Sequence, residues 1–154
     1  MIINAKRIVI GEHYSARIFE DYAPQIRERL RLGYETTVLL VKPQSIAADY
    51  LKASGSGHGG ISANLEKIRT IVVSPQAGPG TRPKANGGLA VKWHGRVLRY
   101  SFVMSEDAVW VRLFTNSEGF SLVPAFCVER STPLYEFFLT DITKLLEQSE
   151  DGSI

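Results

Sequence analysis

The side chains best suited to chemistry in this chain are arginines and aromatic residues that alternate between residues 92 and 114. Alternate residues of an extended strand lie on the same face of a sheet. Flat rings can stack on nucleic-acid bases while guanidinium groups hold phosphates, so this pattern favours a platform for single-stranded nucleic acid. The predicted binding residues are Lys92, Arg99, Trp110, Arg112 and Phe114, and the positive charges of Arg82, Lys84 and Arg96 would extend the same surface.

A structural explanation of the same pattern competes with this one. A domain of this size usually covers both faces of its sheet. The N-terminal half could pack on the arginines and aromatic residues, with Arg99 and Arg112 meeting Glu or Asp side chains from that half. The sequence leaves both readings open.

His94 is the one weak candidate for catalysis. Trp93-His94-Gly95-Arg96 is predicted to be a two-residue hairpin, because Gly and His tolerate a positive φ. At its tip, His94 would lie close to Arg96 and Arg99, as a general acid or base for RNA cleavage requires. A solvated turn histidine without a catalytic role explains the residue equally simply.

Other reactive patterns are weak. The histidines His13, His58 and His94 are far apart, and no Cys/His/carboxylate spacing indicates zinc, so we expect neither a metal nor a cofactor. The Gly-rich segment 55–60 has the rhythm of a phosphate-binding loop, but Ile61 stands where the lysine is needed. We interpret it as a linker. Cys127 is the only cysteine, which excludes an intrachain disulfide, and we expect it to be buried and inert.

Charge is distributed unevenly along the chain, although the net charge is only +2. Residues 61–104 carry 7 basic and 1 acidic side chains, whereas residues 105–154 carry 3 basic and 9 acidic ones. This asymmetry is typical of a polyanion-binding side, or of two segments that attract each other.

No apolar run approaches the roughly 20 residues of a membrane span, and the N-terminus does not resemble a signal peptide, so we expect a cytoplasmic protein.

The predicted elements give an α+β fold, with an N-terminal β-α-β-α-α-β segment and then a four-stranded antiparallel meander closed by a C-terminal amphipathic helix. The first segment has strands near residues 2–10, 34–41 and 70–73. Ser15 is predicted to cap its first helix, Pro24 to kink this helix or split it at Ala23, and Gly33 to end it. Shorter helices follow at 43–53 and from Ser62. We expect one domain over 1–148, with a mixed half at 1–73, a Pro/Gly-rich loop at 74–88, the meander and helix at 89–148, and a disordered tail at 149–154.

The register of the meander follows from its turns. Pairing across them places Arg99 beside Phe114 and Arg112 beside Ser101, and it collects an uncharged face for the C-terminal helix to cover. That face comprises Leu89, Val91, Leu98, Tyr100, Phe102, Met104, Val109, Val111, Leu113, Phe120, Leu122 and Phe126. Thr132 is predicted to cap the helix and Pro133 to begin it. Pro124 indicates that the last strand lies at an edge of the sheet.

Three functions remain in competition. The first is a small binding module, most simply for nucleic acid. The second is a protein-interaction factor of the immunity, adaptor or inhibitor type without catalytic activity, in which the acidic C-terminal third meets a basic partner. Either protein could form a homodimer through its edge strand.

The third is an RNA-cleaving enzyme. Helices followed by an antiparallel meander with basic strand residues, over about Val91 to Phe114, loosely resemble the RelE/ParE toxin class. A helix after the sheet and the acidic C-terminal third depart from that pattern. The resemblance therefore implies a possible activity without assigning a role to any residue.

Overall fold

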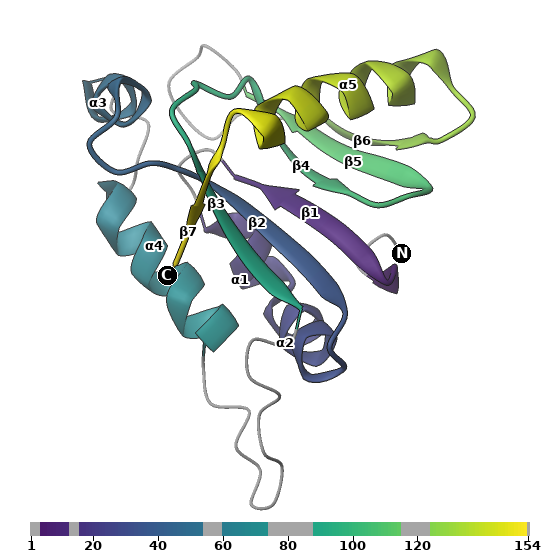
Figure 1. Cartoon of the computed structure of the whole chain (residues 1–154), viewed down its shortest axis with the longest axis horizontal. Helices are drawn as coiled ribbons and strands as arrows, with labels where there is room; N and C mark the ends of the chain where they lie inside the picture. The colour runs from purple at the N-terminus through teal and green to yellow at the C-terminus, as the bar shows by residue number, and fades with distance from the viewer. Residues whose placement is uncertain (1–3, 13–15, 54–59, 74–87, 115–123, 154) are drawn as a thin grey trace, which may run out of the picture.

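One seven-stranded mixed sheet organises the molecule (Figure 1). The computed structural model describes residues 4–12, 16–53, 60–73, 88–114 and 124–153. Its strands are β1 (Arg7–Gly11), β2 (Glu35–Val41), β3 (Leu89–His94), β4 (Tyr100–Met104), β5 (Ala108–Leu113), β6 (Ala125–Glu129) and β7 (Glu150–Gly152). Its helices are α1 (Arg17–Asp21), α2 (Ala23–Arg31), α3 (Ile46–Ala53), α4 (Gly60–Val73) and α5 (Pro133–Glu147).

The strand order is β6-β5-β4-β1-β2-β3-β7. The three central strands β1, β2 and β3 run parallel, while β4, β5 and β6 form an antiparallel meander on one side of β1, and β7 runs antiparallel to β3 on the other. The predicted α+β class, with an antiparallel C-terminal region and a closing helix, is confirmed.

Two apolar clusters lie on opposite faces of the sheet. On one face, α1, α2 and α4 cover the parallel strands, with Phe19, Ile26 and Ile68 fully buried against Ile10 and Val38. On the other face, α5 crosses the sheet diagonally, as Figure 1 shows. Its buried residues Tyr135, Phe138 and Ile142 pack on the apolar face of the meander. Helix α3 forms a third, smaller cluster at the end of β2.

The first helical segment matches its prediction closely. It divides into α1 and α2 at Tyr22, and Pro24 takes a place in the first turn of α2, where its missing N–H costs no hydrogen bond. Gly33 follows α2 with φ of 74°, the left-handed conformation that ends helices. The predicted break and stop are both confirmed.

The predicted strand at 70–73 is wrong, because these residues complete α4. Ile61, Leu65, Ile68 and Ile71 recur every three or four residues and point toward the neighbouring helices and the sheet. This helical period overrides the local preference of Thr, Ile and Val for strands. The third strand of the N-terminal segment therefore does not exist.

The predicted hairpin at 93–96 is also wrong. Strand β3 pairs in parallel with β2 over Thr36–Val41, and β1 and β2 separate it from β4. The segment after His94 therefore crosses the carboxyl ends of two strands before β4 begins. Leu89 and Val91 consequently lie toward the helices α1, α2 and α4, away from α5.

The antiparallel meander thus has three strands, β4 to β6, whose face toward α5 is as predicted for Tyr100, Phe102, Met104, Val109, Val111 and Phe126. Phe120 and Leu122 lie outside the described residues, as do the Gly-rich segment 55–59 and the loop residues 74–87.

We expected a disordered tail from residue 149. Instead Glu150–Gly152 form β7, whose Gly152 lies so close to the indole of Trp93 that a Cβ atom there would clash.

The buried guanidinium of Arg29 connects α2 to the starts of β1 and β2. Arg29 is 3% exposed. Its Nε donates to Thr36 Oγ1 at 3.2 Å, one Nη donates to the Glu35 carbonyl at 2.9 Å, and the other donates to the Ala5 carbonyl. Desolvation lowers the pKa of Arg29, and the ring of Tyr34 lies 5.6 Å from the guanidinium carbon.

Replacing this guanidinium should destabilise the fold. We expect Arg29→Met to lower the free energy of unfolding by about 2–4 kcal/mol, because it leaves buried acceptors without donors. The matched control is Arg27→Met on the same helix, since Arg27 is exposed. Urea unfolding measures both variants, and equal effects would show that the Arg29 hydrogen bonds do not stabilise the fold.

Candidate nucleic-acid interface

Four of the predicted binding residues lie together on the meander. Ser101 pairs with Arg112 and Val103 with Trp110, and the Phe114 N–H donates to the Arg99 carbonyl at 3.1 Å. Both predicted cross-strand neighbours are therefore found. Strand alternation places Trp110 and Arg112 on the same face of β5, and Arg99 and Phe114 lie opposite each other one residue beyond the paired ends of β4 and β5. These four residues, Arg99, Trp110, Arg112 and Phe114, are here called the arginine face.

The outer part of the arginine face is open to solvent. Arg99 is exposed and Arg112 half-buried, and beyond them the side chains of Ala125 and Cys127 on β6 are exposed as well. Figure 1 shows α1, α2 and α4 beneath the parallel strands, with β5 and β6 extending past them. Within the described part of the chain, no ion pair involves Arg99 or Arg112. The finding that Cys127 is exposed corrects the expectation that it is buried.

The inner part of the same face is covered. Ser101 and Val103 are 1% and 5% exposed, and Trp110 packs partly against the helical cluster. The competing structural explanation therefore holds for β4, where the N-terminal half does pack on the sheet. It does not hold for the two arginines, which meet no carboxylate among the described residues.

Lys92 lies away from the arginine face, at the opposite end of the strand order. Its ammonium group pairs with Asp151 of β7 at 2.7 Å, which holds the pKa of that carboxyl below its usual range. Lys42, which the sequence analysis did not single out, pairs with Glu150 at 2.6 Å. In the sequence, only its position directly after the buried strand β2 could have indicated that Lys42 lies at this edge of the sheet. Of these two ion pairs, only Lys92–Asp151 joins the basic segment 61–104 to the acidic segment 105–154.

Arg96 occupies the connection between β3 and β4. It is exposed, and its guanidinium donates to the Gln148 side chain at 3.0 Å. This connection runs past the carboxyl ends of the parallel strands, where open sheets with parallel strands commonly bind ligands. Arg82 and Lys84 lie outside the described residues, so the surface they were predicted to extend is not defined there.

His94 is buried, which contradicts its predicted place at a solvated hairpin tip. It is 1% exposed. Its Nδ1 accepts the Arg96 backbone N–H at 3.3 Å, while its Nε2 has no hydrogen-bond partner among the described residues. Desolvation lowers its pKa from 6.5 to about 4. The imidazole is therefore neutral near pH 7 and does not contact solvent as a general acid or base would have to.

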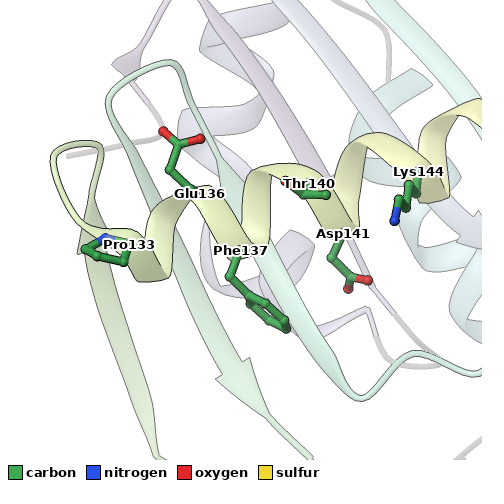
Figure 2. Close-up of a pocket in the computed structure, with 6 residues that line it drawn as sticks. All are labelled: Pro133, Glu136, Phe137, Thr140, Asp141 and Lys144. Atoms are coloured by element: carbon green, nitrogen blue, oxygen red, sulfur yellow. The ribbon is translucent and has the colours of Figure 1, made fainter.

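A groove along the outer flank of α5 offers no alternative reaction centre. Figure 2 shows the described residues that line it, all from this helix: Pro133, Glu136, Phe137, Thr140, Asp141 and Lys144. Asp141 accepts a hydrogen bond from the hydroxyl of Tyr100, and burial together with this bond raises the pKa of Tyr100. No group of three or more potential metal ligands occurs within the described residues.

The fold resembles those of two solved structures. TrmBL2, an archaeal chromatin protein described as showing a novel mode of DNA binding, is 13% identical with a TM-score of 0.55 over 98% of this chain and 47% of that protein. Nuc from Salmonella typhimurium, a phospholipase D family member, is 14% identical with a TM-score of 0.53 over 99% of this chain and 86% of that protein. This chain thus spans about half the length of TrmBL2.

At these identities the likeness concerns the fold alone. No family model matches the sequence, and no curated protein matches it. Among the helices of the described residues, none is long and apolar enough to cross a membrane.

The buried His94 should make stability depend on pH. Between pH 6.5 and about 4, the unfolded chain binds a proton at this residue and the folded protein does not. The free energy of unfolding should therefore fall as the pH falls through this window, by on the order of 2 kcal/mol between pH 6.5 and pH 5. Urea unfolding of the wild type and of His94→Gln at several pH values measures this difference. Parallel curves for the two proteins would show that folded His94 takes up protons normally.

Proposed function

We propose that this protein is a nucleic-acid-binding module that uses the arginine face. The observation that carries the proposal is the pair Arg99, which directly precedes β4, and Arg112 on the neighbouring strand β5; neither has a carboxylate partner among the described residues. An unpaired guanidinium on a solvated sheet keeps its charge available for a phosphate. A neighbouring ring supplies a flat surface for a base.

The position of the arginine face suits a single strand better than a duplex. Its rings can stack only on bases that are unpaired and splayed out, and a duplex keeps its bases inside the helix. Trp110 is half-buried, so one part of its ring is held by the core and the rest remains accessible. A ring fixed in this way loses little conformational freedom when a base stacks on it.

Arg96 could extend the contact to the edge of the sheet. It precedes Arg99 by three residues in the connection that crosses the carboxyl ends of the parallel strands. Its present partner is the neutral side chain of Gln148, so its positive charge is not neutralised there. Lys92 and Lys42 are less suitable, because each already forms an ion pair.

The fold comparison is consistent with this proposal and does not carry it. DNA binding is reported for TrmBL2, and this chain spans only 47% of that protein. The proposal rests on the arginine face of this chain.

The decisive experiment measures binding of single-stranded RNA, single-stranded DNA and duplex DNA by fluorescence anisotropy at two salt concentrations. We expect micromolar binding to the single strands that weakens with salt. The variants Arg99→Glu and Arg112→Glu should each reduce affinity about tenfold or more and lower the salt slope by roughly 1, as expected when one phosphate contact is lost.

The matched control is the double variant Lys52→Glu/Lys144→Glu. It makes the same charge change as Arg99→Glu/Arg112→Glu, but on α3 and α5, away from the arginine face. Its affinity should stay much closer to that of the wild type. Absence of binding at low salt, or equal losses in both double variants, would contradict the proposed function.

A further inference from the structure

The outer edge of β6 pairs with no other strand among the described residues. The Leu113 N–H donates to the Pro124 carbonyl and the Arg130 N–H to the Asp107 carbonyl. These two bonds show which facing residues of β5 and β6 form the hydrogen-bonded pairs. Phe126 and Val128 therefore direct their backbone groups toward β5, whereas Ala125, Cys127 and Glu129 direct theirs outward. Apart from the Glu129 carbonyl, which accepts from Thr132, these outward groups have no partner among the described residues.

The two edges of the sheet differ in their protection. At the far edge, the short strand β7 covers β3, and its carboxylates are paired with Lys42 and Lys92. Strand β6 contains no lysine, no proline and, in its pairing with β5, no bulge. Two of its outward residues, Ala125 and Cys127, have small exposed side chains. A strand of this kind is a template for pairing with another chain.

We infer that β6 is a homodimerisation edge, at which two copies of this chain pair antiparallel about a two-fold axis beside Cys127. In this register Cys127 faces Cys127 of the partner subunit, and Ala125 faces Glu129 of the partner subunit. The outward groups of the two Cys127 residues then satisfy one another, and each Glu129 N–H donates to the Ala125 carbonyl of the other copy, while the Glu129 carbonyl keeps its bonds from Thr132. The same surface serves both copies, as a closed two-fold interface requires.

Charge complementarity favours this occupant. Arg112 lies beside Ala125 in the β5–β6 register, so the dimer would place Arg112, Ala125 and Glu129 of the partner subunit in one row on the same face. Strand spacing puts the outer two of these residues about 10 Å apart, a span that an arginine and a glutamate can bridge over an alanine. Neither Arg112 nor Glu129 has an ion pair among the described residues. Because of the two-fold symmetry, the dimer would contain this ion pair between Arg112 and Glu129 of the partner subunit twice.

Apolar side chains on α5 provide further surface. A five-residue strand pair alone buries less than the roughly 800 Å² per partner that is usual in stable interfaces. Helix α5 begins shortly after β6, and its Leu134 and Phe137 are 47% and 58% exposed. Phe137 packs edge-on against Phe138, whose ring lies 6.3 Å from that of Phe126 on β6. Figure 2 shows Phe137 projecting from the outer flank of the helix.

The inference does not rest on the proposed function, and their tests can be separated. Arg99→Glu alters the arginine face away from β6, so it should weaken nucleic-acid binding and leave the dimer intact. Arg112→Glu should weaken both. A dimer without nucleic-acid affinity would reject only the proposed function, and a monomer that binds nucleic acid would reject only this inference.

Sedimentation velocity of the reduced full-length chain tests the dimer directly. We expect a species of twice the 17.1 kDa monomer mass at high protein concentration. Cys127→Lys should abolish it, because two lysines would face each other across the axis. Cys127→Pro should do the same, because proline lacks the outward N–H and its ring takes the place of that hydrogen at the edge, while the small polar replacement Cys127→Ser should leave the dimer intact. A monomer at every concentration, or a dimer that persists in Cys127→Lys, would overturn the inference.

Thiol cross-linking tests the register. The Cα atoms of a hydrogen-bonded antiparallel pair lie about 5.5 Å apart, within reach of a short bis-maleimide, so the wild type should form a covalent dimer efficiently. The control moves the thiol two residues along the same face with Ala125→Cys/Cys127→Ser. Its two thiols would lie far from each other in the proposed register, so cross-linking should be lost although the dimer remains. Equal cross-linking of both proteins would reject this register.

Discussion

The parallel pairing of β3 with β2 is the constraint on which the remaining arrangement depends. It places two strands between β3 and β4, so the chain must cross the carboxyl ends of β2 and β1 after His94. That crossing buries His94, positions Arg96 at the edge of the sheet and leaves Lys92 far from the arginine face. Strand β7 then covers the outer edge of β3 with paired charges, whereas no strand of the described ranges covers β6 at the other end.

The central strand β1 joins two regions that are built differently. On its β2 side, helices α1, α2 and α4 cover one face of parallel strands, with Arg29 connecting α2 to the sheet through three hydrogen bonds. On its β4 side, α5 covers the opposite face of an antiparallel meander. Because the helices change face, those of the described residues cover the outer meander on one face only. The open arginine face is a consequence of this arrangement, and so is the exposure of Cys127.

The two proposals use adjoining parts of that uncovered region. The arginine face offers charge and rings from β4 and β5, while the β6 edge offers backbone groups. Arg112 belongs to both, since it lies beside Ala125 in the row that a second copy would complete. If both proposals hold, pairing would bring two arginine faces onto one continuous sheet, and Glu129 of the partner subunit would compete with a phosphate for the Arg112 guanidinium, which leaves Arg99 as the unpaired arginine of each face.

Features that depend on neighbouring residues and local periodicity could be predicted from the amino-acid sequence. These include the break between α1 and α2, the cap in which Thr132 accepts from the Tyr135 N–H, and the Ser101–Arg112 register that a tight turn imposes. Tertiary structure decided which strands pair over long distances, because backbone edges are chemically alike and carry no residue-specific signal. It therefore placed β3 beside β2, separated Lys92 from Arg99 and buried His94. It also made α4 a helix, since packing against α1 and α2 outweighed the strand preference of its last residues.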